Sequence, residues 1–238
     1  MTQHHLQGRT DTELLWFQRR GFLQAAAAWT AAGSWAGAQA QSRSNIVELS
    51  GDATVNGQRL RPDQSVQTGD EIVTGPRSTL IFAIGNSAFH MRQNTSMAVE
   101  RGNSITAVSL LRLLNGAVVS VWGKGSRRQI VTPTLTVGIR GTGVYSEMFA
   151  GQNGARSYFC NCYGVVDLVS GSDRQVSEST YHKAVWAEKG ADGQAALRSA
   201  KAINHTDEEL EYLARLVGQR TAWQISGKKG NKETGEAY

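Results

Sequence analysis

The sequence predicts an all-β protein, a β-sandwich or β-roll of short strands with one amphipathic helix near the C-terminus. The 238 residues contain 26 glycines but only 3 prolines, a balance that favours many tight turns. From Ile46 onward, short apolar stretches alternate with turn signals about every 8 to 15 residues. A single strong helical pattern follows the last of these stretches. With 40% hydrophobic and 19% charged residues, the composition is that of a globular protein.

Residues 1–40 have the layout of an export signal. A polar start leads to paired arginines, then to an uncharged, weakly apolar run, and then to a small-x-small cleavage site. The elements are Arg19, Arg20, Phe22, Leu23, Ala38 and Ala40. This order resembles a twin-arginine (Tat) signal peptide and predicts a periplasmic protein. Two alternatives stay open: an uncleaved signal that anchors the chain in the inner membrane, and an amphipathic helix belonging to the fold.

Charge and hydropathy exclude two classes of function. The formal net charge is +5, and it is +4 without residues 1–40, where three arginines and two acidic residues lie. One basic pair, Arg127-Arg128, lies in the middle of the chain. This charge is too small and too dispersed to indicate a nucleic-acid-binding surface. No apolar run reaches the ~18 residues that cross a bilayer, so no transmembrane span is expected after signal cleavage.

Residues 41–189 are predicted to form the β domain. Asn56-Gly57 lies between two extended pieces and predicts a type I′ hairpin, and Gly85-Asn86 predicts another turn. The strongest hairpin signal joins 110–114 to 117–122 through Asn115-Gly116. Further strands are expected at 129–137, 143–149, 157–163 and 165–169.

Residues 190–224 are predicted to be a C-terminal helical segment. Thr206 to Glu209 form a capping box. Leu210, Leu213, Leu216 and Val217 then recur at helical spacing and should pack on the sheet. Residues 190–202 read equally well as a loop or a second short helix, and 225–238 as a disordered tail.

Three segments in order carry a family resemblance: 69–75 (GDEIVTG), 113–118 (LLNGAV) and 130–144, which runs from Ile-Val-Thr-Pro to Ile-Arg-Gly-Thr-Gly-Val. With the closing strand at 163–168, the series resembles the FecR domain over residues 68–169. The matching positions are Gly69, Asp70, Gly75, Asn115, Gly116, Pro133, Arg140, Gly141, Thr142 and Gly164. We expect structural roles for them, and Arg140-Gly141-Thr142 should be a fold-defining turn.

The resemblance implies a non-enzymatic binding, signalling or scaffold module of the cell envelope with a protein partner. It also points to iron-responsive regulation, because the best-known FecR proteins regulate iron uptake. Those proteins carry an anti-sigma segment before a membrane span. About 18 residues precede the signal here, so an anti-sigma role is not expected. The family supplies no catalytic residues, and no Ser/His/Asp set, framed carboxylate pair or nucleotide loop is present, so no enzyme is predicted.

Cys160 and Cys162 form the one constellation with possible chemistry. On a strand both point to one face, with Cα atoms about 6.6 Å apart, at the edge of disulfide range. A three-residue hairpin loop at 171–173 would place Ser170 opposite Arg174 and Cys162 opposite His182, giving a third metal ligand. The alternatives are packed thiols or a disulfide. The alternative function is therefore a metal- or thiol-based periplasmic sensor that uses this Cys-x-Cys strand. No cofactor is expected unless these residues bind zinc or another transition metal.

The remaining histidines and tryptophans are assigned structural roles. His90, between Phe89 and Met91, reads as a partly buried strand residue, and His205 as the residue that leads into the helix. Trp122, Trp186 and Trp223 are expected to be core or lid anchors.

Overall fold

The computed structural model describes residues 44–104, 106–125, 127–151, 154–189 and 194–230. The expected export signal, with Arg19, Arg20, Phe22, Leu23, Ala38 and Ala40, lies outside these residues. Within them, sixteen strands and two helices form an all-β architecture, which confirms the predicted fold class. None of the described helices is long and apolar enough to cross a membrane.

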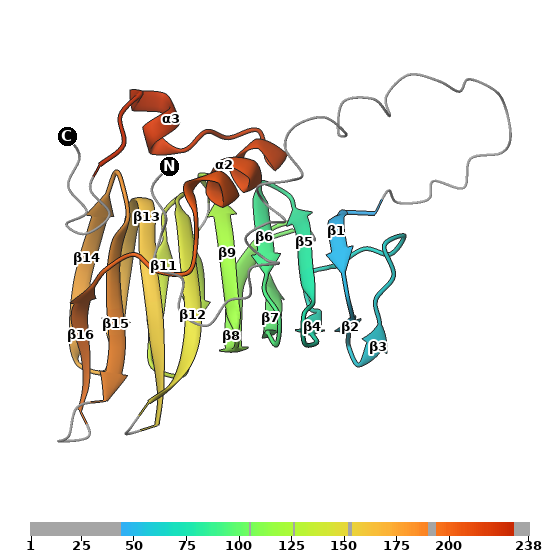
Figure 1. Cartoon of the computed structure of the whole chain (residues 1–238), viewed down its shortest axis with the longest axis horizontal. Coiled ribbons are helices and arrows are strands. Elements are labelled where there is room, and N and C mark those ends of the chain that lie inside the picture. The colour runs from blue at the N-terminus through green and yellow to red at the C-terminus, as the bar shows by residue number, and fades with distance from the viewer. Residues whose placement is uncertain (1–43, 105, 126, 152–153, 190–193, 231–238) are drawn as a thin grey trace, which may run out of the picture.

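The sixteen strands form one continuous hydrogen-bonded sheet, which β13 divides into two parts, here called sheet I and sheet II (Figure 1). Sheet I contains, in spatial order, β1 (Ile46–Ser50), β5 (Thr79–Ile84), β6 (Ser87–Met91), β9 (Ala117–Trp122), β12 (Gly143–Gly151), the first part of β13 (Gly154–Ser170), β15 (Lys183–Lys189) and β16 (Ala195–Ala200). Sheet II contains β14 (Asp173–Ser179), the last part of β13, β11 (Thr136–Ile139), β10 (Arg128–Val131), β8 (Val108–Asn115), β7 (Ser96–Arg101), β4 (Glu71–Thr74), β2 (Ala53–Val55) and β3 (Gln58–Arg59).

Strand β13 belongs to both sheets. Up to Tyr163 it pairs with β12 and β15, and from Gly164 onward it pairs with β11 and β14. Gly164 has φ +99°, and a Cβ there would lie 2.8 Å from Cβ of Thr142. Only glycine fits this transition. Gly141, also at positive φ (+93°), and buried Thr142 pack at the same point, so this part of the FecR-like signature lies where the chain changes sheets.

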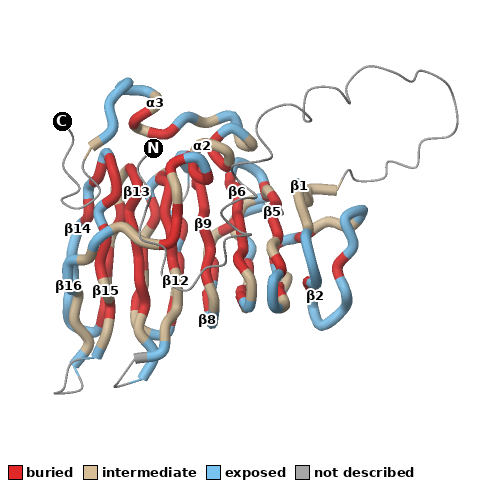
Figure 2. The backbone as a smooth tube through the Cα atoms, in the orientation of Figure 1, coloured by how far each residue is buried: buried red, intermediate tan, exposed pale blue. Residues whose placement is uncertain are grey.

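The middle strands of sheet I are buried on both faces. One face packs against sheet II through a core that includes Phe82, Phe89 and Trp122. The other face packs against helices α2 (Asp207–Leu216) and α3 (Ala222–Ser226), chiefly through Leu210 and Leu213. All residues of β6 and β9 are buried as a result, and Figure 2 shows this red band through the middle strands. Buried polar side chains on the helix-covered face therefore need partners within the protein.

Two predicted turns are confirmed. Asn56 and Gly57 both have positive φ (52° and 76°) between paired residues Val55 and Gln58, as a type I′ turn requires. Gly85-Asn86 joins β5 to β6 as a two-residue loop.

The hairpin predicted at Asn115-Gly116 is wrong. Strand β8 pairs with β7 and β10 in sheet II, whereas β9 pairs with β6 and β12 in sheet I. Gly116 (φ +77°) instead carries the chain from one sheet to the other, and the Thr95 hydroxyl accepts a hydrogen bond from the Ala117 N–H beside it. The physical reason is burial, because β9 is buried on both faces and belongs in the middle layer, which β8 cannot join with its exposed residues.

The C-terminal region differs in detail from its prediction. Residues 195–200, expected in a loop or helix, form β16 and pair with β15. Helix α2 begins with the predicted capping box at Thr206 and Glu209. Helix α3 extends to Ser226, past the expected boundary at 224, and Lys229 contacts Asp207. Residues 231–238 lie outside the described part of the chain.

Candidate metal centre

Four metal-ligating side chains meet between sheet I and the start of α2. They are Cys160 and Cys162 on β13, His182 in the turn between β14 and β15, and His205 immediately before the capping box. One ligand atom from each lies within 4.8 Å of all the others. All four residues are buried, with at most 1% of their surface exposed.

Strand alternation puts the two cysteines together. Phe159 points into the core between the sheets, while Cys160 and Cys162 point to the face that α2 and α3 cover. The two cysteines are not joined by a disulfide. The pleat predicted from the sequence is therefore the one observed.

His182 reaches the cysteines by a route other than the predicted one. Ser170 pairs with Asp173, so the β13–β14 loop has two residues and the expected register was wrong by one. Strand β14 ends at Ser179, and the chain then turns back into β15. The His182 N–H donates to the Cys162 carbonyl (2.9 Å), and its φ of +42° is one that side-chain-bearing residues rarely adopt. The turn thus holds the imidazole over the strand.

His205 is the site residue that sequence reasoning missed. Its Nε2 lies 3.0 Å from Nδ1 of His182 and 3.4 Å from Sγ of Cys162. Nδ1 of His182 lies 3.7 Å from Sγ of Cys160. The position of His205 in the sequence could have identified it. It immediately precedes the one helix expected to pack on the sheet, and few other histidines were candidates for a fourth ligand.

Hydrogen bonds orient both imidazoles toward the cluster. Nδ1 of His205 donates to the Ile203 carbonyl (2.6 Å), and Nε2 of His182 donates to the Asp207 carboxylate (2.9 Å). A carbonyl oxygen only accepts, so the proton of neutral His205 is on Nδ1 and its Nε2 presents a lone pair. Imidazole ligands of metal ions in proteins are oriented in this way by carboxylates and carbonyls.

The separations fit tetrahedral coordination. With metal–sulfur bonds of about 2.3 Å and metal–nitrogen bonds of about 2.05 Å, a tetrahedron has S···N edges of about 3.6 Å and an N···N edge of about 3.3 Å. Two of the four S···N distances here are 3.7 and 3.4 Å, the N···N distance is 3.0 Å, and every pair of ligand atoms lies within 4.8 Å. Two thiolates and two neutral imidazoles are also a common zinc ligand set.

Aromatic rings enclose the cluster. Tyr145 stacks on His205 with ring centroids 4.8 Å apart, and Trp223 of α3 stacks on His182 at 5.4 Å. Burial lowers the pKa of His205, which favours the neutral, ligating form. Burial and the neighbouring Asp207 raise the pKa of Tyr181 well above its usual value, so this phenol remains a hydrogen-bond donor to Asp207. Buried aromatic rings and these oriented polar groups therefore surround the cluster.

Two of the FecR-like signature residues make polar contacts outside the cluster. Arg140 forms an exposed ion pair with Asp167 (2.8 Å), and Asp70 accepts hydrogen bonds from Gln67 and Asn56. The other signature positions are Gly69, Gly75, Asn115, Gly116, Pro133, Gly141, Thr142 and Gly164.

His90 is fully rather than partly buried. Its Nδ1 lies 3.3 Å from Glu209, which also pairs with buried Arg92. The predicted anchors Trp122 and Trp223 are both buried, and Trp186 is partly buried. Glu209 therefore ties α2 to β6 through charged groups, separately from the Cys/His cluster.

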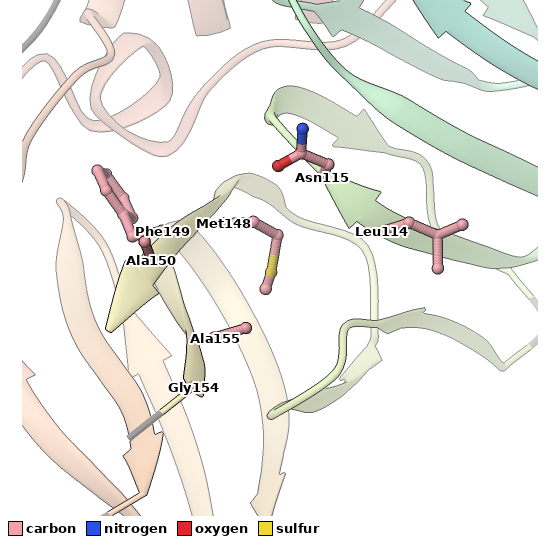
Figure 3. Close-up of a pocket in the computed structure, with 7 residues that line it drawn as sticks. All are labelled: Leu114, Asn115, Met148, Phe149, Ala150, Gly154 and Ala155. Carbon is pink, nitrogen blue, oxygen red and sulfur yellow. The ribbon is translucent and has the colours of Figure 1, made fainter. Parts of the chain in front are cut away.

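An open pocket of about 420 Å³ lies elsewhere, between the end of β8 and the β12–β13 hairpin (Figure 3). It is lined by Leu114, Asn115, Met148, Phe149, Ala150, Gly154 and Ala155. Its lining is mainly apolar and contains no titratable side chain, so it offers no chemistry comparable to the cluster.

Comparison with known proteins assigns no family. No protein-family model matches the chain, and no curated protein matches it in sequence. Two crystal structures of a candidate anti-sigma factor from Parabacteroides distasonis are similar in shape, each with a TM-score of 0.44. The first is 13% identical, and the match covers 62% of this chain and 65% of that structure's chain, slightly under two thirds. The second is 11% identical, and the match covers 72% of this chain and 97% of that structure's chain. Similarity at this level does not assign a function.

Proposed function

We propose that this protein is a non-enzymatic metal-binding module of the cell envelope, with Zn²⁺ bound by Cys160, Cys162, His182 and His205. One observation carries the proposal: four buried ligand atoms converge within 4.8 Å, and both imidazoles are oriented by second hydrogen bonds. Burying such groups together costs free energy unless they have a common partner, and a cation is the partner that this set suits.

Zn²⁺ fits this ligand set better than other common cations. Two thiolates offset the charge of a divalent ion, so the buried centre would be neutral overall. Calcium and magnesium prefer oxygen ligands, whereas zinc accepts sulfur and nitrogen in tetrahedral geometry. Fe²⁺ would bind the same donors less tightly, according to the usual affinity order.

The ligand set supports a structural or regulatory role rather than catalysis. Catalytic zinc sites keep one position open for water or substrate, while structural sites have four protein ligands. Here four protein ligands are present, and Tyr145 and Trp223 cover the imidazoles.

The envelope location rests on the sequence. The Tat-like signal supports export in the folded state, which suits a domain that acquires its metal before export. The FecR resemblance supports a signalling or scaffold role with an envelope protein partner, and iron-responsive regulation is proposed on that resemblance alone.

Metal analysis of protein purified from the periplasm without chelators tests the proposal. We expect one zinc per chain by elemental mass spectrometry, and two free thiols after denaturation and metal removal. Cys160→Ser/Cys162→Ser should lose the zinc. His90→Gln, which removes a buried histidine outside the cluster, should retain it. Iron in place of zinc would favour the iron-linked function, and failure to bind either metal even after reconstitution would overturn the proposal.

A further inference from the structure

We infer that the metal is a latch that fastens the C-terminal segment, residues 201–229, onto sheet I, so that metal occupancy controls how firmly this segment covers the sheet. The inference rests on the proposed zinc site and names what that site regulates. It follows from where the four ligands lie in the chain.

Three of the ligands belong to the β-structure and one to the covering segment. Cys160 and Cys162 lie on β13, and His182 is fixed by its N–H bond to the Cys162 carbonyl. His205 lies 43 residues after Cys162, in the segment that leads into α2. A metal bound by all four would therefore cross-link α2 to the sheet.

The relative position of the two imidazoles fits a bound cation. Nδ1 of His182 and Nε2 of His205 face each other at 3.0 Å, and the other nitrogen of each ring donates to a fixed acceptor. When both imidazoles are neutral, two lone pairs face each other and repel unless a proton or a metal cation lies between them. Without metal, His205 keeps its hydrogen bond to the Ile203 carbonyl and its stacking on Tyr145, but it loses the bond that would join it to the cysteines of β13.

Asp207 extends the latch to the rest of the segment. It accepts hydrogen bonds from His182 and Tyr181 on the sheet side. It also forms an ion pair with Lys229 near the end of the segment. Trp223 of α3 stacks on His182 itself. A displacement of His182 would therefore weaken the contacts of the first turn of α2, of α3 and of the residues after α3.

Other contacts hold α2 without the metal, so release should be graded rather than complete. Leu210 and Leu213 are buried against sheet I, and Glu209 pairs with Arg92 and His90. Residues 201–206, whose links to the sheet are mostly polar, should loosen first.

Hydrogen exchange followed by mass spectrometry tests the latch on the full chain, loaded with one equivalent of zinc or stripped with a chelator. We expect peptides covering 201–217 to exchange at least about tenfold faster without zinc. Peptides from β8 in sheet II should be unchanged and report that the fold is intact. His205→Ala should exchange at the fast rate whether or not zinc is present.

A control and a direct binding measurement separate the possible failures. Glu209→Gln should bind zinc but exchange faster in α2 in both states, which establishes that the method detects loosening. If zinc binds stoichiometrically and exchange in 201–217 does not change, the latch is wrong and the proposed function stands. If no zinc binds, both fail. Should His205→Ala unfold, the comparison of loaded and stripped wild type decides.

Discussion

Nδ1 of His182 lies 3.0 Å from Nε2 of His205, although one residue lies in a turn between strands and the other before a helix. The other nitrogen of each ring makes a hydrogen bond, that of His182 to the Asp207 carboxylate and that of His205 to the Ile203 carbonyl. This preorganisation distinguishes the site from a chance gathering of buried cysteines and histidines, and several measurable consequences follow from it.

Zinc should raise the thermal stability of the protein. A ligand at 1,000 times its Kd stabilises the folded state by about 4.1 kcal/mol, which for a domain of this size raises Tm by roughly 10 °C. Calorimetry with and without a chelator measures the shift. Cys162→Ser should abolish most of it, whereas His90→Gln should lower Tm in both conditions but keep the difference. Equal Tm values with and without zinc would contradict the cross-link.

Asp207→Asn should weaken zinc binding without removing a ligand. Asp207 orients His182 and increases its basicity, and loss of such a partner typically costs 10- to 100-fold in metal affinity. Competition with a chromophoric chelator gives the affinity, and the stoichiometry should stay at one. Asp167→Asn is the matched control, because Asp167 makes an exposed ion pair with Arg140. An affinity equal to wild type in Asp207→Asn would mean that the turn alone orients the ring.

Glu209→Gln should destabilise the fold by about 3 kcal/mol. The substitution leaves Arg92 buried without its anionic partner, and breaking one side of a buried ion pair costs about 3–5 kcal/mol. Urea unfolding measures the change. Glu208→Gln, on the exposed side of the same helical turn, should stay within about 0.5 kcal/mol of wild type. Similar values for the two variants would show that the pair contributes nothing net.

Gly164→Ala should be among the most damaging single-methyl additions to the chain. Its φ of +99° is unfavourable for alanine, and the new Cβ would lie 2.8 Å from Thr142 and 2.9 Å from the Gly141 carbonyl. We expect a loss of about 3 kcal/mol or more. Gly218→Ala, at φ +67° with open space around it, should lose only about 1 kcal/mol. Equal losses would assign the whole cost to backbone conformation and none to the change of sheets.

Local patterns predicted a large part of this protein. The turn at Asn56-Gly57, the capping box at Thr206 and the shared face of Cys160 and Cys162 all appear as expected. Each depends on residues within a few positions of one another, where backbone dihedrals and the strand pleat decide the outcome. The sequence by itself therefore determined the all-β class and the shared face of the two cysteines, and it named three of the four candidate ligands.

Only the tertiary structure decided which segments meet. Asn115-Gly116 has the residues of a hairpin turn, yet it joins two sheets, because a strand buried on both faces must lie in the middle layer. His182 lies beside the cysteines although its predicted register was off by one. His205 lies beside them although β15 and β16 separate it from His182 in the sequence. Such encounters depend on how β13 passes from sheet I to sheet II at Gly164 and on where α2 packs. Both are set by long-range burial of apolar surface, which no short window of sequence contains.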